Sequence, residues 1–273
     1  MRMNGMAVRG RGFGLRYGAL TAIAPSDFEI PSGGVTAVIG PNGSGKSTLL
    51  NAIAGLVEPS AGSIEVGAES GRLSYVMQAT KVNESLPVTV REVVAMGRYA
   101  SLGAYGPMRS QDRAAVNGAL ERLGIVDLAG RHLHDLSGGQ RQRVFVAQGL
   151  AQEHDILLLD EPLTGIDLTT AQAIDEVIHA ETMDGCSVIM TTHDLSEAHS
   201  ADYVVLLAGR VVAAGIPSDV LTESTLVDAY GPSLLHVEKG RVFLDDPAHS
   251  PAAGRHAHER SIHTETDRID LHR

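Results

Sequence analysis

Residues 40–48 read GPNGSGKST and match the pattern G-x-x-x-x-G-K-[ST]. The motif follows the apolar run VTAVI at 35–39 and precedes TLLNAIAG, whose apolar spacing is that of a helix. In this context the glycines let backbone N–H groups face a phosphate chain, and the helix N-terminus adds the positive end of its dipole. The motif therefore predicts a nucleotide-binding loop between a strand and a helix.

Short apolar runs predict the strands of a parallel sheet. They do not alternate polar and apolar residues, so both faces of the sheet are expected to be covered. Helical patterns at 47–54 and 171–183 lie between them, which indicates an α/β fold with crossover connections. A hairpin is expected around residues 208–209. The predicted strands are 35–39, 156–160, 187–191 and 203–207.

Residues 79–135 have a different pattern, with predicted helices at 89–96 and 111–123 and no convincing strand between them. We interpret this stretch as a helical subdomain inserted into the α/β core. The second helix is followed by Gly124 and has an apolar face made of Val116, Ala119, Leu120 and Leu123.

Composition narrows the function classes. The 273 residues carry a formal charge of −11, which argues against a protein that mainly binds nucleic acid through its phosphates. No apolar run approaches the ~20 residues of a membrane-spanning helix, and no signal peptide is recognisable. The single cysteine, Cys186, excludes an internal disulfide framework and is expected to be a small core residue.

Two acids end the run ILLLDE at 156–161, so both carboxylates are expected at the carboxyl edge of the sheet, where ligands bind in open α/β folds. Beside a phosphate loop, Asp160 is placed to hold Mg²⁺ through its water shell and Glu161 to polarise an attacking water. Within the loop, Lys46 is expected to contact the β- and γ-phosphates and Ser47 to bind Mg²⁺. Strand-terminal acids without such a loop would be ordinary surface residues.

The stretch LSGGQRQRVFVAQGLA at 136–151 predicts a helix with an unusual first turn. Ser137 and Gln140 have the spacing of a capping box. Gly138 and Gly139 nevertheless occupy the first turn, where each costs a helix about 1 kcal/mol relative to alanine. An ordinary capped helix explains the first pair but not the glycines.

The order of these motifs resembles the nucleotide-binding subunit of ATP-binding cassette (ABC) transporters over roughly residues 5–240. The resemblance implies a RecA-like P-loop NTPase core with N-terminal antiparallel β elements and an inserted α-helical subdomain at about 79–150. It also implies an ATPase that uses ATP and Mg²⁺ and works as a head-to-tail dimer with two ATP molecules at the interface. The expected domain organisation is an ABC nucleotide-binding domain at 1–240, followed by a disordered, histidine-containing tail at 241–273.

The same resemblance assigns roles to several residues that by themselves would not indicate a function. Gln78 contacts the metal or the attacking water, and His193 contacts the γ-phosphate. Tyr17 stacks on adenine. Asp167 senses the opposite site, although Thr164, Gly165 and Ile166 depart from the common Ser-Ala-Leu before it. The nucleotide contacts are Gly40, Pro41, Asn42, Gly43, Ser44, Gly45, Lys46, Ser47 and Thr48, and from the other subunit Ser137, Gly138, Gly139 and Gln140.

In this family, a chain without a membrane span implies a separate polytopic permease subunit, with the ATPase at the cytoplasmic face of the membrane. An importer would also work with an extracytoplasmic substrate-binding protein. Apolar residues of the insert either contact the permease or form the insert's own core, and both can hold. These residues are Val93, Met96, Tyr99, Leu102, Tyr105 and Met108.

The stretches VVAMGRYASLG at 93–103 and EPLTGID at 161–167 look like the ATPases of zinc, manganese and chelated-iron importers. They favour metal-ion uptake, with zinc or manganese as cargo. The alternatives are a separate-chain exporter ATPase and a soluble ATPase of iron–sulfur cluster assembly. The tail either binds zinc weakly or is only polar, and we favour the second because no compact ligand spacing joins His249, His256, His258, His263 and His272.

Overall fold

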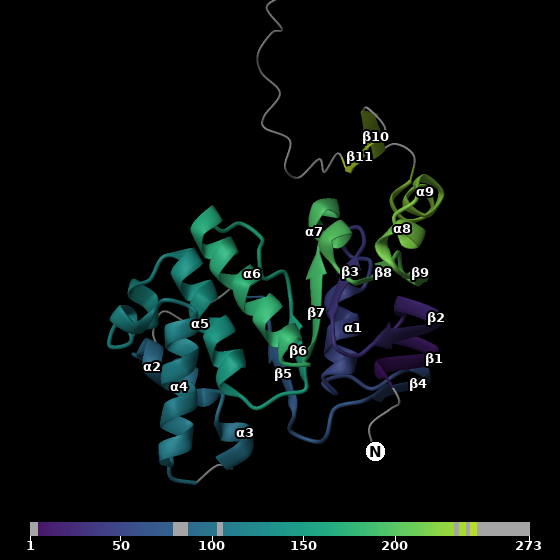
Figure 1. The fold of residues 1–273 in the computed structure, drawn as a ribbon. Coiled ribbons are helices and arrows are strands. Elements are labelled where there is room, and N and C mark those ends of the chain that lie inside the picture. The colour runs from purple at the N-terminus through teal and green to yellow at the C-terminus, as the bar shows by residue number, and fades with distance from the viewer. Residues whose placement is uncertain (1–4, 79–86, 103–105, 232–234, 239–240, 245–273) are drawn as a thin grey trace, which may run out of the picture.

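The computed structural model describes residues 5–78, 87–102, 106–231, 235–238 and 241–244. The chain forms a central, mostly parallel sheet. A smaller antiparallel sheet made of N-terminal strands lies on one side of it, and a group of helices lies on the opposite side (Figure 1). The predicted tail, 241–273, begins with β11 (Arg241–Leu244), which pairs with β10 (Leu235–Glu238) in a hairpin. Its histidines lie outside the described residues.

The central sheet has the order β5-β6-β7-β3-β8-β9. The first five strands run parallel, and β9 returns antiparallel to β8 through the predicted turn, where Gly209 has a φ of 66°. All four predicted strands are present within a residue of their expected ends. The bounds are β3 (Val35–Ile39), β5 (Leu73–Val76), β6 (Ile156–Leu159), β7 (Ser187–Thr192), β8 (Tyr203–Leu207) and β9 (Val211–Gly215).

Both faces of this sheet are buried, as the absence of alternation predicts. On β6, Leu157 belongs to the core beneath α5 (Gly138–Ala151) and α6 (Leu168–Met183). The next residue, Leu158, belongs to the opposite core, which α1 (Lys46–Ile53) and the N-terminal sheet cover. A third cluster lies under α7 (Leu195–Ser200), α8 (Pro217–Val220) and α9 (Glu223–Tyr230).

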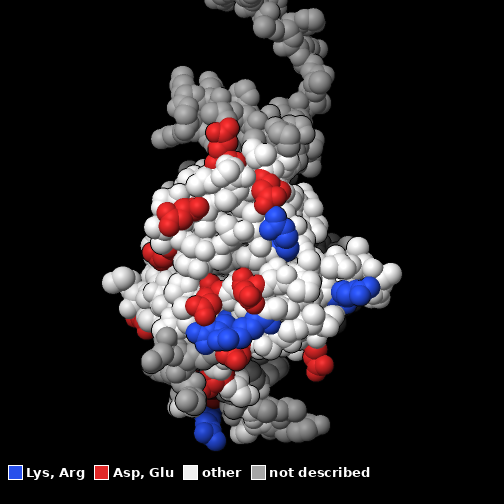
Figure 2. Space-filling view, turned by 90° about the vertical axis from the view of Figure 1, so that its right-hand side faces the viewer, with Lys and Arg blue, Asp and Glu red and all other residues white. Residues whose placement is uncertain are grey.

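The N-terminal sheet consists of β1 (Met6–Tyr17), β2 (Leu20–Pro31) and β4 (Ala61–Val66), paired antiparallel in the order β2-β1-β4. Phe13 and Phe28 pack edge to face in its core, with ring centroids 5.8 Å apart. On the face of the molecule in Figure 2, acidic and basic side chains lie among one another. Within the N-terminal sheet, Arg9 on β1 and Glu29 on β2 form an ion pair at 2.6 Å.

Between β5 and β6 the described residues form helices, as predicted for the insert. They are α2 (Val90–Met96), α3 (Tyr99–Leu102), α4 (Ser110–Arg122), two 3-10 turns (Val126–Leu128 and Leu133–Asp135) and α5. The predicted apolar face of α4 is buried against α2 and α5. A buried ion pair holds the group together: Arg98 Nε donates to Asp112 Oδ1 at 3.0 Å, and Arg98 Nη1 donates to the Ala151 carbonyl at 2.9 Å.

The apolar residues singled out in the insert divide between the two roles. Val93 is in the core, and Met108 packs against that core. Met96 and Tyr99 are exposed, at 39% and 56%. Leu102 is half-buried, and Tyr105 lies outside the described residues. The exposed pair is therefore available to a partner, whereas Val93 stabilises the insert itself.

Candidate nucleotide-binding site

The carboxyl ends of four neighbouring parallel strands carry the predicted catalytic and phosphate-binding residues. The sheet order places β7 between β6 and β3, so residues distant in sequence meet at one edge. Gln78 follows β5, Asp160 and Glu161 follow β6, His193 follows β7, and the phosphate loop follows β3. Strand register explains this arrangement, because Leu159 pairs with Met190 and Ile39 pairs with Thr192.

The phosphate loop holds Lys46 in a constrained, largely buried position. Its ammonium donates to the Gly40 carbonyl at 2.7 Å and to the Pro41 carbonyl at 3.3 Å. Burial lowers the pKa of Lys46, although the nearby Glu161 and Asp160 carboxylates act to raise it. A lysine held by carbonyls of its own loop is a fixed point charge beside the helix N-terminus, which is the electrostatic feature that phosphate binding requires.

Two details of the loop show that it fits a phosphate chain. Ser44 Oγ is buried without a hydrogen-bond partner among the described residues, and an anion would supply the missing acceptor. Gly45 has a φ of 103°, and a Cβ there would lie 2.8 Å from Ile23 Cγ1 on β2. Glycine is thus required both for the left-handed turn and for the approach of the N-terminal sheet.

A hydrogen-bonded chain joins the loop to the two acids. Ser47 Oγ donates to Asp160 Oδ1 at 3.2 Å, and Thr191 Oγ1 donates to the same oxygen at 2.6 Å. A hydroxyl next to a carboxylate on the open edge of a sheet is an oxygen donor set of the kind that Mg²⁺ prefers, with room left for water ligands. The residues present therefore fit a magnesium ion.

Glu161 has an unusual backbone, with a φ of 49°, the only positive value among the described non-glycine residues. Its amide donates to Thr191 Oγ1 at 2.8 Å, which holds the turn in place. Its carboxylate accepts from Gln78 Nε2 at 2.9 Å. Strain of this kind persists only where the surroundings enforce it, and here it directs a carboxylate away from the strand toward Gln78.

Thr191 is a site residue that sequence reasoning missed. It is fully buried on β7, and its hydroxyl accepts from Glu161 and donates to Asp160. The available signal was the pair Thr191–Thr192 ending an otherwise apolar strand next to the strand that carries the acids. The role of these hydroxyls becomes apparent only when β6 and β7 are known to be neighbours.

We expect Thr191→Val to lower both ATP hydrolysis and stability, because it leaves the Glu161 amide without its partner and removes a donor to Asp160. Losing such a buried bond costs about 1–3 kcal/mol. Thermal unfolding and phosphate release measure the two effects. Thr191→Ser, which retains the hydroxyl, should keep most of the hydrolysis; wild-type hydrolysis by Thr191→Val would contradict the assigned role.

The predicted capping box of α5 is present. Gln140 N donates to Ser137 Oγ at 3.3 Å, and Ser137 N donates to Gln140 Oε1 at 3.0 Å. The two glycines differ. A Cβ at Gly138 would meet nothing within 4 Å, whereas one at Gly139 would lie 2.9 Å from both Asp167 Oδ2 and Thr170 Oγ1. Packing against α6 thus accounts for Gly139, which the capping of α5 by itself does not explain.

Asp167 caps α6, accepting from Thr170 N at 3.0 Å and from Thr170 Oγ1 at 2.9 Å. These hydrogen bonds with Thr170 lower the pKa of Asp167. Because Asp167 is the N-cap, the helix begins at Leu168, three residues before the predicted start. The contact with Gly139 places Asp167 beside the first turn of α5.

The remaining predicted residues lie in the phosphate loop itself, at the end of β1 and after β7. Asn42 and Gly43 are exposed, and Thr48 is half-buried in the first turn of α1. Tyr17 ends β1 with 47% of its surface exposed, and β2 of the same hairpin contacts the loop at Gly45. His193 follows β7 and is half-buried.

The structure gathers the predicted residues into two groups. One is the phosphate loop with Gln78, Asp160 and Glu161; the other is the first turn of α5 with Asp167. In Figure 1, α6 and the strands β6 and β7 lie between α5 and α1. The two groups occupy separate parts of one chain.

Comparison with known proteins agrees with this geometry. The family model described as ABC transporter matches residues 23–164. The chain is 38% identical to the chelated iron transport system membrane protein YfeB of Yersinia pestis, over 83% of this chain and 79% of YfeB. It is 40% identical to the zinc transport system ATP-binding protein TroB of Treponema pallidum, over 75% and 79% of the two chains.

A solved structure described as a metal-chelate type ABC transporter in an inward-facing conformation superposes with a TM-score of 0.75 and 28% identity. The match covers 87% of this chain and 95% of that chain. Fold and phosphate loop define a P-loop ATPase. The chain belongs to the ABC transporter family and is a nucleotide-binding ATPase of that family. Among the described residues, no helix combines the length and apolarity needed to cross a membrane.

Proposed function

We propose that this chain is the ATPase subunit of a metal-ion importer with zinc or manganese as cargo. It would be bound to a polytopic permease at the cytoplasmic face of the membrane and would act as a head-to-tail dimer. The permease would receive its cargo from an extracytoplasmic substrate-binding protein. The observation that supports the dimer most directly is that the exposed first turn of α5, with open space at Gly138, lies apart from the phosphate loop of the same chain.

We infer the steps of hydrolysis from the positions of the site's residues. Lys46 and the loop amides neutralise the β- and γ-phosphates of ATP. Ser47 and Asp160 would hold Mg²⁺, with Gln78 beside it, and the ion would offset charge on the transferred phosphoryl group. Glu161, held by Thr191 and Gln78, accepts a proton from the attacking water. His193, at the end of the neighbouring strand, contacts the γ-phosphate.

The dimer completes the site. Gly138 is exposed with open space around it, so backbone N–H groups of α5 can approach an anion closely. Ser137 adds a hydroxyl to this surface, and Asp167, the N-cap of α6, lies beside it and would sense the site of the other subunit. A second copy arranged head to tail would bring this helix N-terminus to the γ-phosphate held by the first copy. Stacking of Tyr17 on adenine fits its exposed position.

The cargo assignment rests on the relatives. Besides the chelated-iron and zinc systems, the chain is 37% identical to the manganese transport system ATP-binding protein MntA of Synechocystis, over 78% of this chain. Sequence similarity to proteins of iron, zinc and manganese systems supports a metal ion as cargo, and the measurement below tests whether that metal is zinc or manganese, as proposed. The nucleotide chemistry is the same for every cargo.

The test is the metal content of cells. Zinc, manganese and iron are measured by mass spectrometry in cells lacking the protein, complemented with the wild type or with Lys46→Ala, under limitation for each metal. We expect one metal to fall in the deletion, to recover with the wild type and to stay low with Lys46→Ala. Unchanged metals throughout would refute metal import; accumulation of a metal in the deletion would indicate export instead.

A further inference from the structure

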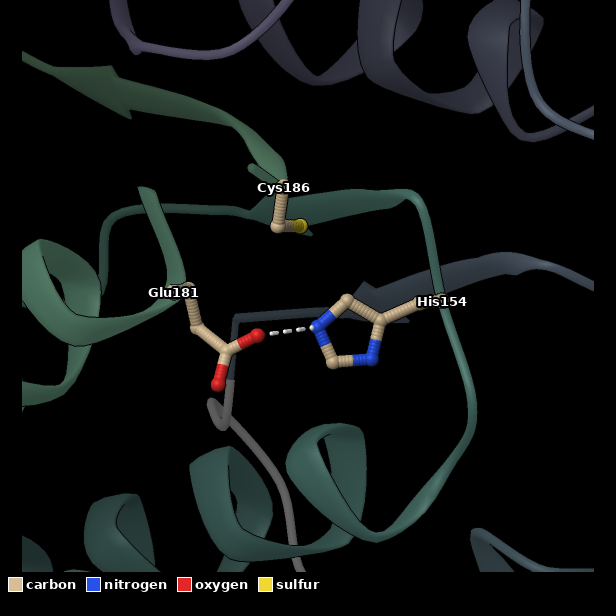
Figure 3. A group of neighbouring side chains, drawn as sticks. All are labelled: His154, Glu181 and Cys186. Atoms are coloured by element: carbon tan, nitrogen blue, oxygen red, sulfur yellow. Dashed lines mark hydrogen bonds and ion pairs between the residues drawn. The ribbon is translucent and has the colours of Figure 1, made fainter. Parts of the chain in front are cut away.

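A second cluster of chemically reactive side chains lies at the opposite edge of the central sheet from the phosphate loop. His154 precedes β6, Cys186 immediately precedes β7, and Glu181 is in the last turns of α6 (Figure 3). One ligand atom from each residue, a ring nitrogen, a thiol sulfur and a carboxylate oxygen, lies within 4.8 Å of the other two. None of the three takes part in the nucleotide site.

The backbone fixes these three residues relative to one another. The Cys186 amide donates to the Glu181 carbonyl at 3.0 Å across the tight turn at Gly185, and the Ser187 amide donates to the Asp155 carbonyl at 3.0 Å. Strands β6 and β7 pair directly beside them, Ile156 against Ser187. Neighbouring hydrogen bonds therefore hold all three ligand positions, as a preorganised site requires.

The side chains around the cluster orient it as the surroundings of a metal site do. His154 Nδ1 lies 2.7 Å from the Gln152 carbonyl, which directs Nε2 toward Glu181 Oε2 at 2.9 Å. Arg122 Nη1 binds the other oxygen, Oε1, at 2.6 Å and leaves Oε2 facing the cluster. A carbonyl on the far ring nitrogen and a partner on the far carboxylate oxygen are typical outer contacts of metal ligands.

The ring of His154 lies against the Glu181 carboxylate and close to the Cys186 thiol. Burial by itself would lower the pKa of His154, but contacts with Cys186 and Glu181 raise it to about 10. Two acceptors, the Gln152 carbonyl and the Glu181 carboxylate, flank the ring, so the protonated form satisfies both. Metal binding would displace this proton, because a histidine ligand must be neutral.

We propose that His154, Glu181 and Cys186 form a binding site for a divalent cation of the zinc class. Nitrogen, oxygen and sulfur from one residue each form a donor set that suits Zn²⁺ with water as a fourth ligand. Ligand atoms around a tetrahedral zinc lie roughly 3–4 Å apart, so closing the cluster requires only small side-chain shifts. The bound ion joins α6 to β6 and β7, at the opposite end of α6 from Asp167.

The chain's single cysteine makes the test specific. Cobalt(II) is added in equimolar amount to the reduced, metal-free full-length protein, and absorbance is recorded. We expect a near-ultraviolet thiolate-to-cobalt charge-transfer band, which Zn²⁺ abolishes by displacement. Because the chain has no other thiol, neither the tail histidines nor the phosphate loop can produce this band. We also expect Zn²⁺ to raise the melting temperature.

Variants separate a three-ligand site from a thiol that binds metal alone. Cys186→Ser should abolish the band, and His154→Gln and Glu181→Gln should each weaken cobalt binding at least about tenfold, in the range for lost ligands and their supports. His179→Gln is the matched control, since His179 is an exposed histidine on α6, the helix that carries Glu181. Absence of the band in wild type with a reduced thiol, or an undiminished band in both His154→Gln and Glu181→Gln, overturns the proposal.

Discussion

Glu161→Gln should reduce ATP hydrolysis about 10²–10⁴-fold, the usual contribution of a general base, while ATP binding persists. The amide has nearly the same shape, and neither the Thr191 hydroxyl nor the Gln78 side chain has to move far. Lys46, Ser47 and Asp160 are untouched, so the phosphates keep their partners. Binding without hydrolysis then traps the closed state, and the variant should be an ATP-bound dimer.

Phosphate release measures the first effect, and light scattering after gel filtration with and without ATP and Mg²⁺ measures the second. Glu176→Gln provides the control, because it makes the same chemical change at an exposed position of α6. It should leave both quantities at wild-type values. A Glu161→Gln protein that hydrolyses ATP normally would remove Glu161 from the mechanism, and one that stays monomeric at saturating ATP would refute the head-to-tail dimer.

The sheet and the phosphate loop could be predicted because their signals are local. Strands buried on both faces appear as unbroken apolar runs, and the loop motif specifies the strand before it and the helix after it. Residues at strand ends were also predictable, since carboxyl ends of parallel strands share one edge. Gln78, Asp160 and Glu161 meet at that edge for this reason.

What the sequence could not reveal depends on contacts between distant elements. Thr191 acquires its role only because β7 lies beside β6, and the sequence does not state which strands are neighbours. Cys186 is buried, as expected of a small core residue, but its approach to His154 requires the same neighbouring strands. The requirement for glycine at 139 likewise depends on α6 beginning at Leu168 and bringing Asp167 to α5.

Gly138→Asp should leave the chain at least as stable as the wild type and yet nearly abolish ATP-driven dimerisation. Within one chain the new side chain enters open space, and an acid in the first turn of α5 interacts favourably with the helix dipole. In a head-to-tail dimer the same carboxylate would face the γ-phosphate of the other subunit. Like charges brought together at an interface cost several kcal/mol, which corresponds to at least about 100-fold in affinity.

Two further variants test whether this loss has an electrostatic cause. Gly138→Asn has the same size without the charge and should lose much less dimerisation than Gly138→Asp. Gly139→Ala adds no charge but places a Cβ 2.9 Å from Asp167 Oδ2, so it should lower the melting temperature of the monomer itself. If Gly138→Asp dimerised normally with ATP, the first turn of α5 would not face a phosphate. A lower melting temperature for Gly139→Ala, together with lost dimerisation for Gly138→Asp, would show that the adjacent glycines serve different contacts. Gly139 would serve a contact inside the chain, and Gly138 one between two chains.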